Sequence, residues 1–162
     1  DGINMQIVRL LAYWYSKQEM CVKWHGRLSS PFALSNGTRQ GGVLSPLLFA
    51  RYIWKVLAAI VGAGIACNVG GMFINVLAYA DDIVILAPAW RALQQLIDIL
   101  SVNAKDIDLK INASKTVCLV FQPKNRARRL ASIFPQFKVD GVSLPFVQQF
   151  KYMGHYCFRS VR

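Results

Sequence analysis

Acidic residues are scarce in the last third of this chain. Residues 109–162 contain ten lysines and arginines but a single acid, Asp140, whereas residues 1–108 contain nine basic and seven acidic side chains. The formal charge is therefore +9 over the last third and +2 before it, which gives the total of +11. Such an excess favours a polyanionic partner, and nucleic acid fits it better than an anionic membrane surface or a merely solvated face.

Metal-binding and disulfide patterns are also missing. None of the four cysteines forms a C-x-x-C pair, and the two histidines are far apart in the sequence. This spacing argues against a zinc site and a disulfide framework, and it predicts a reducing, intracellular compartment. The N-terminus lacks the basic-then-apolar order of a secretory signal peptide, so we expect a protein that is not secreted.

Charged residues are absent from Val56 to Ala80, and a stretch of this length can cross a bilayer. However, the pair Gly70-Gly71 interrupts it, and it leads directly into Asp81-Asp82, which is costly at a membrane boundary. We therefore expect no transmembrane segment and no membrane partner. The stretch is better explained as a helix end, a glycine-rich loop and a buried strand.

Hydrophobic residues make up 54% of the 162 positions, enough for the core of one domain or of a fragment of one. Apolar residues at helical spacing predict three helices, which begin near Ile3, Ser45 and Pro88. Alternating or β-branched runs predict strands at residues 20–24, 32–34, 72–78, 83–86, 116–121, 137–139 and 150–153. The predicted fold class is α+β, a small antiparallel sheet with helices packed on one face.

Two adjacent acids, Asp81 and Asp82, lie between the apolar runs at residues 72–78 and 83–86. The runs predict a hairpin with the acids at its turn, where the alternation of side chains breaks and both carboxylates can approach one point. Hard oxygen ligands of this kind suit Mg²⁺, and paired metal ions are a common device for phosphoryl transfer. The alternative is an ordinary turn, because aspartate often hydrogen-bonds its own backbone there.

Four motifs follow one another along the chain: an Arg-Gln-Gly loop before a helix, the acidic hairpin, an Asn-x-x-Lys-Thr turn and a Phe-Lys-Tyr-Met-Gly segment. In these motifs and their order, the chain resembles the reverse transcriptases of non-LTR (LINE-type) retrotransposons. The matching stretches are residues 35–49, 79–82, 110–116 and 150–154, and the resemblance covers nearly the whole chain. It implies a palm-like antiparallel sheet, a fragment of a right-hand polymerase, and RNA-directed DNA synthesis.

The resemblance also implies roles for residues around the hairpin. Asp81 and Asp82 would be the catalytic ligands of Mg²⁺ (or Mn²⁺), and Tyr79 would buttress the nucleotide or the primer end, although a buried aromatic on a strand is the ordinary explanation. Lys115 resembles the lysine near the leaving pyrophosphate, where a cation stabilises developing charge. The alternative for Lys115 is a solvent-facing lysine in a turn.

Two further segments would contact nucleic acid. Arg39, Gln40 and Gly41 resemble the loop that meets a phosphate and the templating base pair, with a helix-capping loop that only packs as the alternative. The second segment resembles the hairpin that grips the primer backbone, and it consists of Phe150, Lys151, Tyr152, Met153 and Gly154.

We therefore predict one partial reverse transcriptase domain over residues 1–162. Residues 1–122 would form the core of the palm with the catalytic hairpin, and residues 123–162 a basic connector and the primer-grip-like hairpin. The expected partners are an RNA template, a DNA primer and deoxynucleoside triphosphates, in the nucleus. The family's third carboxylate and its fingers have no counterpart here, so we expect them in an upstream segment of the same polyprotein and expect the isolated chain to be inactive.

A non-catalytic function is the rival hypothesis, in which the chain is a nucleic-acid-binding remnant of a decayed retroelement. The intact Asp81-Asp82 pair and Gln40 favour the polymerase. The missing carboxylate and fingers favour the remnant.

Overall fold

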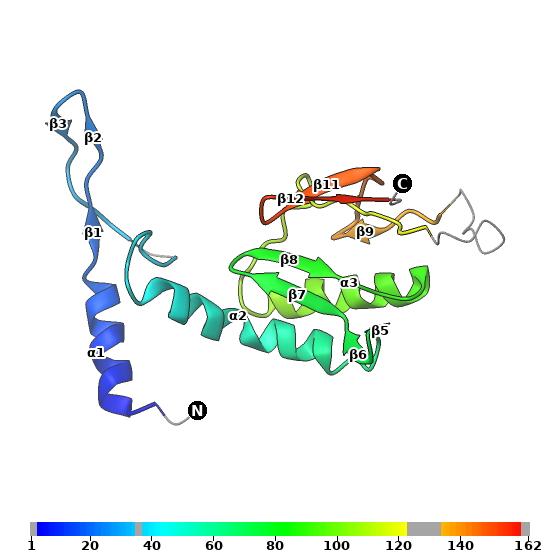
Figure 1. Cartoon of the computed structure of the whole chain (residues 1–162). Coiled ribbons are helices and arrows are strands. Elements are labelled where there is room, and N and C mark those ends of the chain that lie inside the picture. The colour runs from blue at the N-terminus through cyan, green and yellow to red at the C-terminus, as the bar shows by residue number, and fades with distance from the viewer. Residues whose placement is uncertain (1–2, 35–36, 123–133, 160–162) are drawn as a thin grey trace. The chain divides into compact units, whose positions relative to one another are not determined.

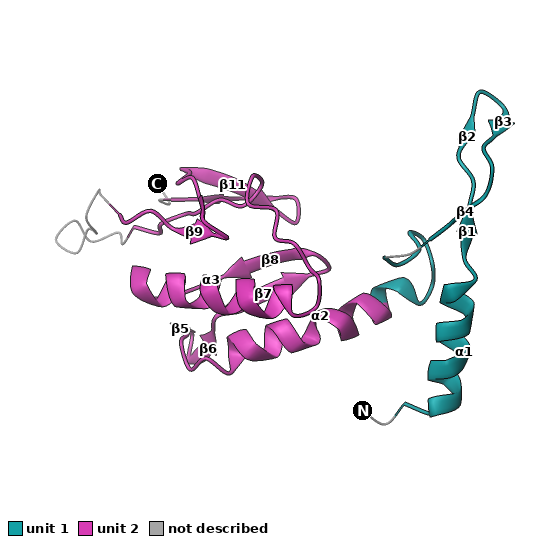
Figure 2. Ribbon diagram, turned by 180° about the vertical axis from the view of Figure 1, so that it is seen from behind, with its two compact units in different colours: residues 1–46 teal, residues 47–162 magenta. Residues whose placement is uncertain are grey.

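The computed structural model of the chain describes residues 3–34, 37–122 and 134–159 (Figure 1). The chain divides into two compact units, residues 1–46 and residues 47–162 (Figure 2). The basic connector predicted at residues 123–133 lies outside the described residues, as does the Ser35-Asn36 start of the first matching stretch.

The first unit contains one helix and two short antiparallel ladders, in which β1 pairs with β4 and β2 pairs with β3. Asn4 caps the helix, because its side-chain oxygen accepts a hydrogen bond from the backbone N–H of Gln6. The strand predicted at residues 20–24 is divided in two, since the backbone of Val22 bonds to Ser29 between the ladders. The elements are α1 Met5–Ser16, β1 Glu19–Met20, β2 Lys23–Trp24, β3 Arg27–Leu28 and β4 Phe32–Ala33.

The second unit contains the remaining two helices and four hairpins. Helix α2 starts at Ser45, two residues before the boundary between the units, and both later helices begin close to their predicted positions. The elements are α2 Ser45–Val61, β5 Cys67–Val69, β6 Met72–Ile74, β7 Val76–Tyr79, β8 Asp82–Ile85, α3 Trp90–Lys105, β9 Lys138–Val139, β10 Val142–Ser143, β11 Gln149–Tyr152 and β12 His155–Phe158.

These elements are of the α+β class, as predicted, but the sheet is divided more than expected. The described strands pair as six separate two-stranded antiparallel sheets rather than as one sheet. The prediction of a strand at residues 116–121 is wrong. Only Cys118 makes a bridge there, to Phe146, because the backbone of Cys118 exchanges just two hydrogen bonds with residues 145–147. The run at residues 72–78 is likewise split at Asn75 into β6 and β7.

Helix α3 lies between two hydrophobic clusters of the second unit. Leu96 packs with buried residues of α2, whereas its neighbour Ile97 packs with Cys118 and the residues around β9 and β10. Adjacent helical positions point about 100° apart, so one helix serves both clusters. Burial raises the pKa of the Cys118 thiol to about 11, which keeps it neutral as a small apolar side chain. The remaining buried members are Ile53, Val56, Ile60, Phe137, Val139 and Leu144.

Gln94 attaches α3 to the short strand β9. Its side-chain oxygen accepts a hydrogen bond from the backbone N–H of Lys138 at 3.1 Å, and its side-chain nitrogen donates to the carbonyl of the same residue at 3.0 Å. The amide therefore replaces the backbone partner that a neighbouring strand would provide. This contact helps to explain how a strand of two residues is held in place.

The uncharged stretch from Val56 to Ala80 divides into the end of α2, the β5–β6 hairpin and β7. Among the described residues, no helix has both the length and the apolar character needed to cross a membrane. The expected helix end, glycine-containing turn and strand are found, but the strand is not buried as predicted: Val76 is half-buried and the rest of β7 is exposed.

Asn75, the residue before β7, links the β7–β8 hairpin to helix α2. It is buried, and its side-chain nitrogen donates a hydrogen bond of 2.7 Å to the carbonyl of Ile60, in the last turn of α2. Carbonyls at a helix C-terminus lack partners within the helix, so Asn75 satisfies one that is buried.

We expect Asn75→Ala to lower the free energy of unfolding by about 0.5–1.5 kcal/mol, because it removes one buried hydrogen bond to a carbonyl that then keeps only the bond of 3.2 Å from the Ala63 backbone N–H. Urea unfolding followed by circular dichroism measures the effect. Asn68→Ala is the control, since the exposed Asn68 side chain accepts one hydrogen bond from Gly71 and water can replace it. Equal losses in the two variants would contradict the structural role given to Asn75.

Candidate active site

The β7–β8 hairpin presents one face to the helices and the other to solvent. Its register pairs Ala78 with Ile83 and Tyr79 with Asp82, and paired residues of a ladder share a face. Ile83 packs against α2 and α3, together with Val76 and Ile85 (Figures 1 and 2). Tyr79 and Asp82 therefore lie on the opposite face, away from the core.

Tyr79 is 61% exposed. The interpretation of this ring as an ordinary buried aromatic on a strand is therefore wrong. An exposed tyrosine beside an exposed aspartate is available to a ligand, and their cross-strand pairing holds the two side chains as neighbours on one face.

The turn between β7 and β8 contains Ala80 and Asp81, and Ala80 has a φ of +51°. Four other hairpins of the described chain have two-residue turns whose second residue is a glycine with positive φ. Only the acidic hairpin has no glycine in its turn. An aspartate thus stands where the other hairpins have the residue that suits such a turn best. The first turn residue has positive φ in all five hairpins, and Ala80 adopts it here.

We expect Ala80→Gly to leave the free energy of unfolding unchanged or to raise it by up to about 1 kcal/mol. Glycine removes a left-handed strain of about 1–2 kcal/mol, which its greater freedom in the unfolded chain partly offsets. Ala78→Gly, in the adjacent strand, is the matched control and should lower it by about 0.5–1 kcal/mol. Urea titration of both variants decides the matter, and equal destabilisation would show that Ala80 carries no such strain.

Both carboxylates of the hairpin, those of Asp81 and Asp82, are exposed. Over the described part of the chain, neither carboxylate has a hydrogen-bond or ion-pair partner, so their oxygens are accessible to a cation. Their donor type fits Mg²⁺ or Mn²⁺, since Mg²⁺ in polymerase-like sites is usually held by one or two carboxylates together with substrate phosphates and water. No third His, Cys, Asp or Glu joins them in a possible metal-binding group within the described residues.

Lys115 lies in a turn that Asn112 organises. The side-chain oxygen of Asn112 accepts hydrogen bonds from the Ser114 hydroxyl at 2.7 Å and the Lys115 backbone N–H at 3.3 Å, and its carbonyl accepts from Thr116. The Lys115 side chain is exposed, and no hydrogen bond or ion pair within the described ranges joins it to the acidic hairpin. Sequence reasoning missed the role of Asn112, although an asparagine that starts such a turn is its usual signal.

The Arg39–Gly42 loop, in the first unit, is held by the start of α2. The Ser45 hydroxyl donates a hydrogen bond of 2.6 Å to the carbonyl of Arg39. A Cβ at Gly42 would lie 2.7 Å from that hydroxyl oxygen and 3.1 Å from the Arg39 carbonyl oxygen, so a larger residue would displace the Ser45 side chain or the loop backbone. Gly42 therefore serves packing within the loop.

The three residues before Gly42 are not held by packing in this way. Arg39 and Gln40 are exposed, and a Cβ at Gly41 would meet nothing within 4 Å. The packing alternative thus explains one glycine of the loop and leaves Arg39, Gln40 and Gly41 available to a ligand.

The predicted primer-grip segment forms the β11–β12 hairpin. Along β11, Phe150 and Tyr152 are half-buried and Lys151 is exposed, so the aromatic rings and the cation lie on opposite faces. Met153 and Gly154 form the turn, both with positive φ. The Lys151 ammonium lies 5.9 Å from the ring centroid of Tyr156, its partner across the ladder.

The comparisons with known proteins agree on one family. Residues 4–157 match the family model described as "Reverse transcriptase (RNA-dependent DNA polymerase)". Over 134 residues, 80% of this chain, it is 32% identical to the "Retrovirus-related Pol polyprotein from type-2 retrotransposable element R2DM" of Drosophila melanogaster. Over 145 residues, 81% of this chain, it is 29% identical to the "Retrovirus-related Pol polyprotein from type-1 retrotransposable element R2" of Popillia japonica. The aligned parts cover 12% and 19% of these relatives.

Proposed function

Because this chain belongs to the reverse transcriptase family, we propose that it supplies the palm carboxylates for RNA-directed DNA synthesis. The match and the two R2 relatives confirm the predicted resemblance to the reverse transcriptases of non-LTR retrotransposons. The observation that carries the proposal is the acidic hairpin. Asp81 and Asp82 are exposed and have no partner among the described residues, at the end of two strands anchored on α2 and α3.

In the proposed mechanism, Asp81 and Asp82 hold divalent ions at the tip of the hairpin. When bound, such ions neutralise phosphate charge and orient the attacking 3′-hydroxyl of the primer. The chain's own contribution is position: packing of Ile83 and Ile85 against the helices fixes the strands, so that the carboxylates need little reorganisation. Tyr79, on the face of Asp82, would support the nucleotide or the primer end.

The other predicted residues have supporting roles in this proposal. Lys115 would stabilise charge on the leaving pyrophosphate, supported by its exposure in a turn that hydrogen bonds hold in shape. Arg39, Gln40 and Gly41 would contact the template, supported by their exposure. In the β11–β12 hairpin, exposed Lys151 suits a primer phosphate, whereas the half-buried rings suit packing.

We further propose that residues 1–162 are one partial domain of a longer polyprotein, with a palm-like arrangement over residues 1–122 and a connector and primer grip over residues 123–162. The small share of each relative that is aligned supports this, as does the finding of only two carboxylates at the site among the described residues. A further segment would supply the third carboxylate and the fingers. The substrates would be an RNA template, a DNA primer and deoxynucleoside triphosphates, used in the nucleus.

One observation favours the rival function, a nucleic-acid-binding remnant without catalysis. Within the described residues, no third metal-ligating side chain accompanies Asp81 and Asp82. A remnant would keep the basic surface and its affinity for nucleic acid, and that affinity would fall steeply as salt rises.

A chimera separates the two functions. The 134 residues of this chain that align with the Drosophila polyprotein replace the aligned segment of that protein, which supplies all the remaining parts. We expect Mg²⁺-dependent extension of a DNA primer on an RNA template. A chimera that binds the template and primer as tightly as the unaltered relative, yet extends nothing, would support the remnant instead.

A further inference from the structure

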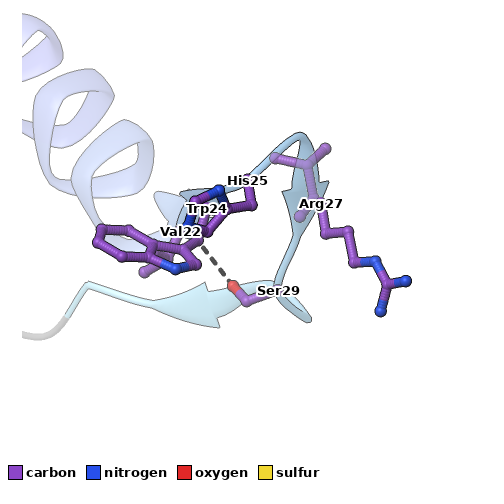
Figure 3. A pocket seen from close by; sticks show the side chains of 6 residues that line it. Val22, Trp24, His25, Arg27 and Ser29 are labelled. Carbon is purple, nitrogen blue, oxygen red and sulfur yellow. Dashed lines mark hydrogen bonds between the residues drawn. The ribbon is translucent and has the colours of Figure 1, made fainter.

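The β2–β3 hairpin of the first unit exposes an aromatic platform. Trp24 is 73% exposed, and the His25 ring lies edge-on beside it with a centroid distance of 5.3 Å (Figure 3). These rings line an open hollow of about 580 Å³. A tryptophan this exposed gains little from packing in its own chain, so its ring face is free to stack on a planar ligand.

The backbone of this hairpin is fixed at both ends. His25 and Gly26 form its turn, both with positive φ, which matches the twist of the two strands. At its base, the Val22 backbone N–H donates a hydrogen bond of 2.9 Å to the Ser29 hydroxyl. The Ser29 backbone N–H donates another, also of 2.9 Å, to the Val22 carbonyl. The platform is therefore held in shape before any ligand arrives, which lowers the entropy cost of binding.

Positive charge accompanies the rings. Arg27 pairs with Trp24 across the ladder and so shares its face, whereas Lys23 lies on the opposite face of the hairpin. No acidic residue occurs within the hairpin itself, from Lys23 to Leu28. In Figure 3 the Arg27 side chain extends away from the two rings. It is therefore placed to meet a charge beside the stacked group rather than to cover the same ring face.

We propose that the β2–β3 hairpin is a binding site for single-stranded nucleic acid, with an unpaired base stacked on Trp24 and an adjacent phosphate bound by Arg27, its partner across the ladder. Alternation of aromatic and basic side chains is what unpaired strands require, because each nucleotide offers one flat base and one negative charge. An apolar protein segment fits less well, since it leaves the Arg27 guanidinium without a partner. The inference rests on the proposed function and deepens it, by naming a place where an unpaired part of the template or primer is held.

Titration of the full chain with fluorescein-labelled dodecamers tests the stacking. Oligouridylate and oligothymidylate are used in separate arms, in the presence of EDTA, and anisotropy gives the dissociation constants. We expect Trp24→Ala to weaken binding about 5- to 100-fold, and Trp24→Phe to restore most of the loss. Similar losses in both arms indicate recognition of any single strand, whereas a loss with uridylate alone indicates RNA.

Trp54→Ala is the matched control, because Trp54 is 62% exposed but lies on α2, outside the hairpin. It should change the dissociation constant less than twofold. Circular dichroism should show that both variants keep the wild-type fold, as expected for exposed side chains. Unchanged binding in Trp24→Ala, or equal losses in both variants, would overturn the proposal. If Trp24→Ala alters only self-association of the chain, the hairpin is a protein contact and the proposal is also wrong.

Salt dependence tests the charged part of the site. Each phosphate contact on a single strand contributes about 0.7 to the slope of log affinity against log salt, so Arg27→Ala should reduce the slope by about that amount. Arg27→Lys keeps the charge and should keep the slope. An unchanged slope in Arg27→Ala would remove Arg27 from the site.

The metal-free assay separates this inference from the proposed function. Oligonucleotide binding in EDTA requires none of the divalent ions that the proposed function needs, and primer extension by the chimera does not depend on the EDTA assay. Failure of the hairpin proposal therefore leaves the polymerase proposal standing, and the reverse also holds.

Discussion

Asp81→Asn is expected to reduce RNA-templated primer extension by the chimera about 1,000-fold or more. A metal ion contributes several kcal/mol to stabilising transition-state charge, and each 1.4 kcal/mol corresponds to a factor of ten in rate. Asparagine has nearly the shape of aspartate but no charge, so the effect reports the loss of a metal ligand and not of packing. Single-turnover extension of a labelled primer, at saturating template and nucleotide, measures the chemical step.

Asp108→Asn provides the matched control for this substitution. Asp108 is also exposed, and its backbone is left-handed just after α3, a conformation that asparagine tolerates as well as aspartate does. Its variant should extend primers within about twofold of the unaltered chimera. Asp82→Asn should show a loss comparable to that of Asp81→Asn. If Asp81→Asn and Asp108→Asn extend at the same rate, the acidic hairpin is not the catalytic site.

Leu96→Ala is expected to lower the free energy of unfolding by about 2–5 kcal/mol, the range for large-to-small changes in a well-packed core. Leu96 is 0% exposed and packs with Ile53, Val56 and Ile60 of α2, under the strands of the acidic hairpin. The substitution removes apolar contacts and leaves a cavity between the two helices and the hairpin. Urea unfolding monitored by circular dichroism gives the value.

Val102→Ala, on the same helix, is the control for this prediction. Val102 is 61% exposed, so truncation of its side chain should change the free energy of unfolding by less than about 0.5 kcal/mol. A similar effect of the two substitutions would mean that α3 does not pack as described. In that event, the hairpin would also lack the support that the proposed mechanism requires.

The elements around the site could be predicted because each has a strong local pattern. Apolar residues at helical spacing located α2 and α3, and two β-branched runs around Asp81-Asp82 located the β7–β8 hairpin. Gly62 follows the last residue of α2, as is usual for a glycine at a helix end. These signals lie within a few residues of the features that they predict, so no tertiary contact was needed to find them.

What the sequence did not reveal depends on contacts between distant residues. The bond from Asn75 to Ile60 spans fifteen positions, and the amide of Gln94 substitutes for a strand that pairs with Lys138. Neither has a local pattern. The run at residues 116–121 has the composition of a strand, but it finds a partner for only one bridge and so is not one.

The roles of single residues in loops were also difficult to predict. Arg39, Gln40 and Gly41 are followed by a second glycine, Gly42, and only the structure shows that the Ser45 hydroxyl lies where a Cβ of Gly42 would be. The sequence left open whether the Tyr79 ring is buried. The register of the hairpin places the ring on the solvent face beside Asp82. Side-chain environment decides such roles, and environment follows from the fold.

Titration of the full chain with Mn²⁺, followed by NMR relaxation of the backbone amides, tests the metal site most directly. Bound Mn²⁺ relaxes nearby nuclei strongly, so even a weak site built from two carboxylates is detectable. We predict enhanced relaxation centred on residues 79–83 that disappears in Asp81→Asn. Equal enhancement at the other acidic stretch, Asp106 to Asp108, or none at the β7–β8 turn, would contradict the assignment of Asp81 and Asp82 as metal ligands.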